Sequence, residues 1–134
     1  MIKVCGIGPG HPDYLTFESY KIIKESEKVY AFKRAKETLK DIRDDIIEIS
    51  SLKNLLPLGN ENITILASGD PLFFGICKYL KDKGVEIESV YPGISSYQYL
   101  MAKLNLPWQD AFLGSLHNRE IDFKNLLREE LIIL

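Results

Sequence analysis

Short apolar runs alternate with amphipathic stretches along the 134 residues of the chain. The runs have the length of buried strands, and the stretches between them repeat their apolar positions every three to four residues, as helices do. The pattern predicts strands over residues 2–7, 29–32, 45–49, 63–67, 85–91 and 111–116. It predicts helices over residues 17–27, 33–41, 51–58, 72–83, 96–104 and 123–129. This alternation indicates an α/β domain with a mostly parallel sheet flanked by helices.

Several residues mark the expected ends of helices. Thr16 is placed to cap the helix that starts at residue 17, and Gly84 follows residues 72–83 as a left-handed terminator. Asp70 and Pro71 suit the N-cap and the first position of a helix, where a carboxylate also complements the helix dipole. Capping explains Asp70 structurally, but the same loop can also contact a ligand through the Gly69 backbone, and the two roles are compatible.

The last four residues, 131–134, form an apolar run with the composition of a buried strand. A final strand can lie inside a sheet, but neither a polar tail nor a closing turn follows this one. We therefore expect residues 1–128 to form one domain, and residues 129–134 to be the first strand of a second, truncated domain.

Composition narrows the class of protein. Seventeen basic and 19 acidic side chains give a net charge of −2, which argues against a broad nucleic-acid surface but leaves room for a local basic patch. No apolar run reaches the roughly 20 residues of a membrane span, and the N-terminus does not resemble a secretion signal. Cys5 and Cys77 lack paired spacing and, with His11 and His117, form no metal-site pattern. We expect a cytoplasmic protein with free thiols.

Four unusual loops follow four of the predicted strands, at residues 6–13, 68–71, 92–96 and 115–119. In an open parallel sheet, ligands bind beyond the carboxyl ends of the strands. If these strands are parallel, all four loops lie at one edge of the sheet. Their convergence predicts a ligand site there more strongly than any single motif does.

The first of these loops is rich in glycine. Gly6, Gly8 and Gly10 permit tight turns and a close approach of backbone to ligand. The loop is not the dinucleotide fingerprint, because His11 stands at the third glycine position, and it is not a phosphate-binding P-loop, because no Gly-Lys-Ser/Thr follows. By itself it is equally compatible with a ligand site and with a plain strand-to-helix turn.

A dinucleotide-dependent oxidoreductase is also disfavoured by the second predicted strand. An acidic residue that binds the ribose is expected near the end of that strand. Residues 29–32 are instead followed by Lys33 and Arg34. We interpret these two cations as the solvated start of a helix.

Taken together, the motifs resemble the tetrapyrrole methylase family. Residues 6–16 read GIGPGHPDYLT and are similar to the family's N-terminal signature. Residues 67–75 (ASGDPLFFG), 92–98 (PGISSYQ), 106–110 (LPWQD) and 115–119 (SLHNR) resemble the branch that methylates carbon 5 of precorrin-6Y or cobalt-precorrin-7 in cobalamin biosynthesis. The resemblance covers nearly the whole chain, and it is the combination of motifs that is specific.

The resemblance implies a methyltransferase that uses S-adenosyl-L-methionine and releases S-adenosyl-L-homocysteine. It also implies the N-terminal domain of the family's two-domain fold, with the cofactor between the domains. The implied cofactor contacts in this half are Pro9, Ser68, Gly69, Asp70, Phe73, Ser95 and Ser96. Methyl transfer from a sulfonium is an in-line displacement that needs little acid catalysis, and the sequence identifies no catalytic residue.

The substrate implied by the resemblance is a precorrin or cobalt-precorrin macrocycle with several carboxylates. Their charge and their position in the fourth loop suggest that His117 and Arg119 hold its acetate or propionate arms. Asn118 departs from the branch, which usually has glycine there, but asparagine also tolerates a positive φ. The resemblance further implies a homodimer and allows for a separate or fused partner that methylates another carbon and decarboxylates.

Two alternatives remain open. One is a methyltransferase of the same fold that modifies a protein or an RNA, although residues 72–75 and 106–108 argue against it. The other is a non-catalytic fragment or binding module, which the apolar ending favours.

Overall fold

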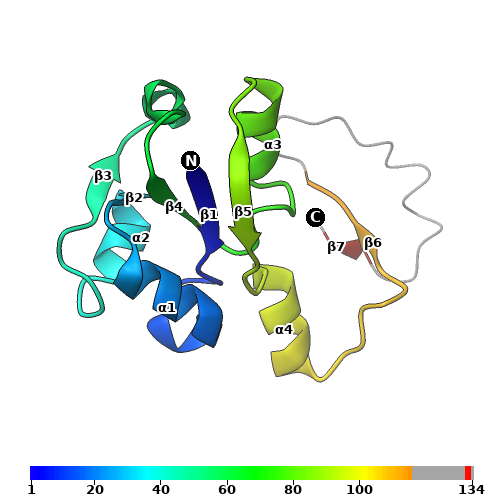
Figure 1. The fold of residues 1–134 in the computed structure, drawn as a ribbon. Coiled ribbons are helices and arrows are strands. Elements are labelled where there is room, and N and C mark those ends of the chain that lie inside the picture. Colours follow the sequence, from blue (N-terminus) through cyan, green and yellow to red (C-terminus); the bar gives the residue numbers. More distant parts are fainter. Residues whose placement is uncertain (116–131, 134) are drawn as a thin grey trace. The chain divides into compact units, whose positions relative to one another are not determined.

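The structure is a computed structural model that describes residues 1–115, 132 and 133 (Figure 1). Residues 1–96 form one compact unit, and residues 97–134 belong to a second. The predicted helix over residues 123–129 and the predicted substrate residues His117 and Arg119 lie outside the described residues.

The first unit is built on a five-stranded sheet in which every pairing is parallel. The strands lie in the order β3-β2-β4-β1-β5, with β4 and β1 side by side and β2 and β5 as their outer neighbours. Their bounds are Ile2–Gly6 (β1), Val29–Phe32 (β2), Ile47–Ile49 (β3), Ile63–Ala67 (β4) and Ile87–Tyr91 (β5). The prediction of a parallel sheet is thereby confirmed.

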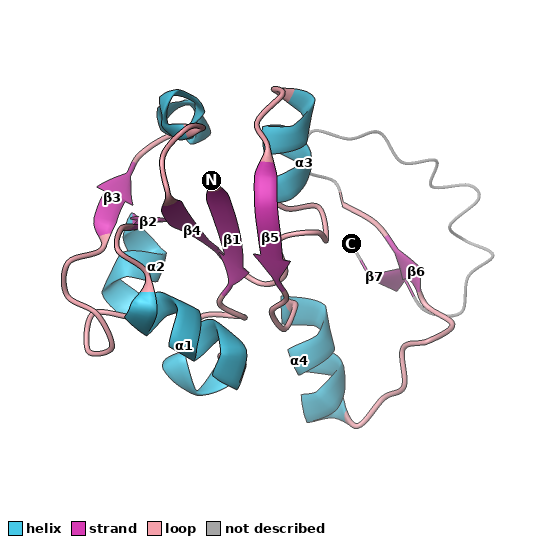
Figure 2. Ribbon diagram, in the orientation of Figure 1, coloured by secondary structure: helices cyan, strands magenta, loops and turns pink. Residues whose placement is uncertain are grey.

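Helices follow the strands in alternation, as Figure 2 shows in cyan and magenta. The helices of the first unit are η1 (Pro12–Tyr14), α1 (Phe17–Glu25), α2 (Lys33–Thr38), η2 (Leu52–Leu58) and α3 (Ile76–Asp82). Of these, η1 and η2 are 3-10 helices. The helix α4 (Ser96–Leu104) begins at the last residue of the first unit and continues into the second. Two short strands, β6 (Phe112–Leu113) and β7 (Ile132–Ile133), pair in parallel within the second unit.

Two apolar clusters form the core because side chains of a strand alternate between the two faces of the sheet. Ile2 and Val4 of β1 join one cluster with residues of η2 and α3, and Cys5 joins the other with residues of α1 and α2. The first cluster comprises Ile2, Val4, Ile49, Leu55, Ile63, Ile65, Ile76, Cys77 and Leu80. The second comprises Cys5, Ile7, Ile23, Val29, Ala31, Ala35, Leu39, Ile46 and Leu66. Helices therefore cover both faces, as a buried parallel sheet requires.

Two of the predicted helix ends are confirmed. The Thr16 hydroxyl oxygen accepts a hydrogen bond from the Ser19 N–H at 3.0 Å and caps α1. Gly84 has a φ of +74° just after α3, and the Val85 N–H returns to the Leu80 carbonyl at 2.9 Å. This closing bond is the kind that a left-handed residue permits at a helix end.

The predicted start of the helix over residues 72–83 is wrong, because α3 begins only at Ile76. Residues 71–75 form turns, in which Phe74 has a left-handed φ of +49° and Gly75 is the extended N-cap. Asp70 consequently does not cap the helix. Its carboxylate binds the backbone of two loops, and this arrangement depends on contacts that are distant in sequence.

Candidate functional site

The loops after β4, β1 and β5 meet at the carboxyl edge of the sheet, because these three strands are neighbours. Gly8 and Gly69 form an isolated bridge between the first two loops. The Gly69 N–H donates to the Gly8 carbonyl at 2.9 Å, and the Gly8 N–H donates to the Gly69 carbonyl at 3.3 Å. Both residues have positive φ values, +75° for Gly8 and +62° for Gly69, a region that glycine enters without steric cost.

Gly6 and Gly93 allow the first and third loops to touch. A Cβ atom on Gly6 would lie 2.6 Å from the Gly93 nitrogen, and one on Gly93 would overlap the Gly69 carbonyl oxygen. The obstructing atoms are backbone, which cannot move aside as a flexible side chain can. The close packing of the three loops therefore requires glycine at both positions.

Asp70 ties the second loop to the third. One of its carboxylate oxygens accepts the Leu72 N–H at 2.8 Å, and the other accepts the Gly93 N–H at 3.1 Å. Hydrogen bonds to an ionised acceptor are stronger than neutral ones. Asp70 thus fixes the position of both loops around the Gly69 backbone.

A pocket of about 290 Å³ opens among these loops. Its lining combines glycine, proline and serine residues with one phenylalanine and two charged residues. The lining residues are Pro9, Gly10, Arg34, Ser68, Gly69, Asp70, Phe73, Ser95 and Ser96. All seven residues predicted to contact a cofactor are in this set, so the structure brings them together in one place. We call it the Arg34 pocket.

Gly10 and Arg34 are the lining residues that are not among the predicted cofactor contacts. Arg34 lies on α2 two positions after the end of β2, and it is exposed as expected for a solvated helix start. That interpretation is nevertheless incomplete, because Arg34 also lines the pocket. The relevant signal is the strand order: β2 lies beside β4, which brings the end of β2 near the 68–71 loop.

His11 and the two cysteines do not line the Arg34 pocket. The His11 Nδ1 atom accepts the Asp13 N–H at 3.1 Å and caps η1. Cys5 and Cys77 are free and buried. Burial raises the pKa of Cys5 to about 11 and also raises the pKa of Cys77, which disfavours the reactive thiolate.

A second and larger hollow of about 460 Å³ surrounds Arg43 on the first unit. Its lining is Lys24, Lys40, Asp41, Ile42, Arg43, Asp44 and Asp45. We call it the Arg43 hollow.

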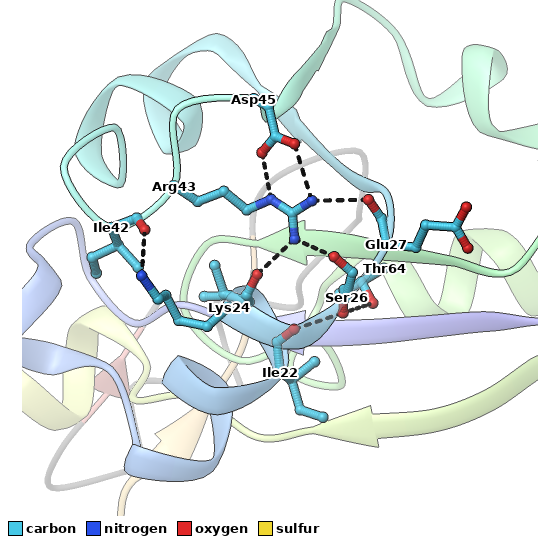
Figure 3. A network of polar contacts seen from close by, with 9 residues as sticks. Ile22, Lys24, Ser26, Glu27, Ile42, Arg43, Asp45 and Thr64 are labelled. Atoms are coloured by element: carbon cyan, nitrogen blue, oxygen red, sulfur yellow. Dashed lines mark hydrogen bonds and ion pairs between the residues drawn. The ribbon is translucent and has the colours of Figure 1, made fainter.

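Figure 3 shows the polar contacts of the Arg43 guanidinium. It donates to the carbonyls of Ile23 and Glu27, each at 2.9 Å, and to the Ser26 carbonyl. It also binds both carboxylate oxygens of Asp45, at 2.5 and 3.3 Å, and this hydrogen bonding lowers the pKa of Asp45. The carbonyls lie at the end of α1 and just beyond it, so Arg43 closes that end and has a structural role.

Among residues 1–115, 132 and 133, no group of three or more His, Cys, Asp and Glu side chains is arranged to hold a metal ion. Within the same residues, no helix has the length and apolar character needed to cross a membrane.

Comparison with known proteins identifies the family of the chain. The sequence profile of the Tetrapyrrole (Corrin/Porphyrin) Methylases matches residues 1–131. The chain belongs to this family. A relative from Methanocaldococcus jannaschii, described as a probable cobalt-precorrin-7 C(5)-methyltransferase, is 38% identical over 95% of this chain and 65% of the relative. The cobalt-precorrin-7 C(5)-methyltransferase of Salmonella typhimurium is 29% identical over 94% of this chain and 66% of the relative. The chain thus spans about two thirds of their length.

Solved structures support the same fold. The precorrin-6Y methylase of Archaeoglobus fulgidus matches with a TM-score of 0.71 and 22% identity, over 87% of this chain and 65% of that one. The uroporphyrin-III-C-methyltransferase of Thermus thermophilus matches with a TM-score of 0.64 and 19% identity, over 90% of this chain and 63% of that one. The predicted α/β fold of a tetrapyrrole methylase domain is confirmed.

Proposed function

We propose that this chain supplies the N-terminal, cofactor-binding part of a methyltransferase that transfers a methyl group from S-adenosyl-L-methionine to carbon 5 of a precorrin-type tetrapyrrole. The observation that supports this most directly is the Arg34 pocket, where all seven expected cofactor contacts meet. Membership of the tetrapyrrole methylase family supports the reaction type. The names of the M. jannaschii and S. typhimurium relatives support the macrocycle and the carbon position.

The lining of the pocket fits a nucleoside thioether. Phe73 provides an apolar aromatic surface, while Ser68 and Ser95 bring hydroxyl groups. Mostly preformed pockets with a few well-placed polar groups are typical of small-molecule sites, whose volumes are about 300–1,000 Å³. At about 290 Å³ the pocket matches part of a cofactor rather than a whole tetrapyrrole. We therefore assign the ring of the macrocycle to a surface beyond this pocket.

The role of the chain in the reaction is to bind and orient. When bound, S-adenosyl-L-methionine supplies a methyl group that its sulfonium has already activated. Gly6 and Gly93 let the loop backbones pack closely, and Asp70 holds the second and third loops in place. Such pre-organisation accelerates a two-substrate reaction by fixing the distance and direction of attack. None of the residues that line the pocket is assigned a proton-transfer step.

Several parts of the proposal concern residues near the C-terminus, the assembly and the location of the protein. His117 and Arg119 are proposed to hold carboxylate arms of the macrocycle, and residues 129–134 are proposed to begin a second domain that completes the cleft. A homodimer is proposed on the resemblance to the family, and a cytoplasmic location on the unpaired spacing of Cys5 and Cys77. A decarboxylating partner enzyme, separate or fused, is proposed on the resemblance to the family.

The test is a methyl-transfer assay with isotopically labelled S-adenosyl-L-methionine and the protein at full length. We expect label in a precorrin-6Y or cobalt-precorrin-7 acceptor and none in a translation factor or ribosomal RNA. If only the translation factor or the ribosomal RNA were labelled, the substrate would be a protein or an RNA and not a tetrapyrrole. No transfer to any acceptor, with correctly folded protein, would contradict the proposal.

A further inference from the structure

We propose that Arg34 binds a carboxylate group of a ligand in the Arg34 pocket, an inference that rests on the proposed function and specifies the chemistry of its site. Two charged side chains line this pocket, Arg34 and Asp70. The two differ in how much of their hydrogen-bonding capacity the protein itself uses.

The Asp70 carboxylate is already engaged. Each of its oxygens accepts a backbone N–H, from Leu72 at 2.8 Å and from Gly93 at 3.1 Å. These bonds hold the loops in place. Asp70 is therefore not placed as the ionic partner of Arg34, and within the described part of the chain no ion pair joins the two.

The Arg34 guanidinium, in contrast, has no hydrogen bond or ion pair to any side chain or carbonyl among residues 1–115, 132 and 133. The printed contact of this residue is made by its backbone carbonyl, which accepts the Thr38 hydroxyl at 2.9 Å. A guanidinium presents five N–H donors in a planar fork that matches a carboxylate with two parallel bonds. Arg34 lines a small pocket and its guanidinium has no partner within the described part of the chain, so it is suited to bind an anionic, planar group there.

Two ligands of the proposed reaction contain such a group. The amino-acid part of S-adenosyl-L-methionine ends in a carboxylate, and a precorrin-type macrocycle has acetate and propionate arms. The pocket is large enough for part of the first ligand or for one arm of the second. Both sources offer the same chemistry to Arg34, and a binding experiment can distinguish them.

The experiment compares wild-type protein at full length with Arg34→Ala, Arg34→Lys and Lys33→Ala. Lys33 is the matched control, because it is the adjacent exposed cation on α2 and is not part of the pocket lining. Binding of S-adenosyl-L-homocysteine and of 5′-methylthioadenosine, which lacks the amino-acid carboxylate, is measured by calorimetry. The KM and kcat for the macrocycle are measured separately, and circular dichroism and thermal unfolding confirm that each variant is folded.

If Arg34 binds the cofactor carboxylate, Arg34→Ala weakens S-adenosyl-L-homocysteine binding by about tenfold to hundredfold and leaves 5′-methylthioadenosine binding unchanged. If it binds a macrocycle arm, the affinity for both nucleosides is unchanged and the macrocycle KM rises by about tenfold with kcat retained. Arg34→Lys is expected to be intermediate, because it keeps the charge and loses the fork.

The proposal is overturned if Arg34→Ala matches the wild type in every one of these measurements, or if Lys33→Ala has an equal effect. Failure of the proposed function is recognised separately, because wild-type protein would then bind neither nucleoside and transfer no methyl group. That result would overturn both proposals, whereas an active wild type with an unaffected Arg34→Ala variant would overturn this one alone.

Discussion

The Arg43 hollow and the Arg34 pocket are each lined by an arginine, but the two side chains differ in how many hydrogen bonds they make to the protein. The Arg43 side chain is 11% exposed and donates to three carbonyls and to Asp45. Arg34 is exposed and has no side-chain partner within the described residues. The hollow around Arg43 is the larger, at about 460 Å³ against 290 Å³. The proposed ligand site therefore rests on hydrogen-bonding capacity that the described residues leave unused, and not on the size of the depression.

The largest expected difference between the two regions is in stability. Arg43→Ala leaves the carbonyls of Ile23, Ser26 and Glu27 without their donor, and we expect the free energy of unfolding to fall by about 3 kcal/mol. Arg34→Ala removes no bond within the described residues and should change that free energy by less than about 0.5 kcal/mol. Urea unfolding of both variants measures the difference, and equal losses would refute the contrast.

The contact of the three loops is the next feature to test. In Gly93→Ala the new Cβ would overlap the Gly69 carbonyl oxygen, and we expect a loss of about 2 kcal/mol in stability together with weaker S-adenosyl-L-homocysteine binding. Gly59→Ala is the matched control. Its φ is −56° and its Cβ would meet the nearest atom at 3.7 Å, so it should change neither quantity. Normal binding by Gly93→Ala would show that the loop contact does not shape the pocket.

Asp70→Asn tests whether the carboxylate positions the loops. The amide keeps one acceptor oxygen, so either Leu72 or Gly93 loses its partner, and we expect stability to fall by about 1 kcal/mol with a several-fold loss of cofactor affinity. Asp82→Asn is the control, because Asp82 pairs with Lys78 on the exposed surface of α3 and such pairs contribute little. Calorimetry and urea unfolding measure both effects, and unchanged values for Asp70→Asn would exclude the positioning role.

The smallest expected effect is the pH dependence of folding stability that the Arg43–Asp45 pair causes. Hydrogen bonding from Arg43 lowers the pKa of Asp45 below its ordinary value of 3.8. A depressed carboxyl pKa stabilises the folded state above the ordinary value, and this contribution is lost as the pH falls through the folded value. Wild type and Asp45→Asn should therefore differ slightly near neutral pH and converge in acid, as followed by unfolding at several pH values. A difference that grows in acid would have the wrong sign.

Much of the fold could be predicted because periodicity and capping are local. The bounds of β2, β4 and α4 match the predicted ranges, and Thr16 caps α1 as expected. The start of α3 could not be predicted in this way. Asp70 is an apt N-cap by composition, but its carboxylate binds Gly93, which is 23 residues away in sequence, and Phe74 adopts a left-handed conformation.

The candidate site likewise has a part that could be predicted from the sequence and a part that could not. The loops that contain Pro9, Ser68 and Ser95 could be grouped because loops after parallel strands share one edge of the sheet. The choice of these residues as cofactor contacts came from the resemblance to the family. Arg34 could not be placed with them, since only the strand order puts β2 beside β4. His117 and Arg119 lie outside the described residues and stay predictions.

The most direct test of the proposed cofactor site is an amide chemical-shift titration of the isotope-labelled protein with S-adenosyl-L-homocysteine. We predict saturable shifts at the backbone amides of Gly10, Gly69 and Ser95, with no change at Arg43 or Asp45. Shifts centred on the Arg43 hollow, or no shifts at any concentration of ligand, would contradict the assignment of the Arg34 pocket to the cofactor.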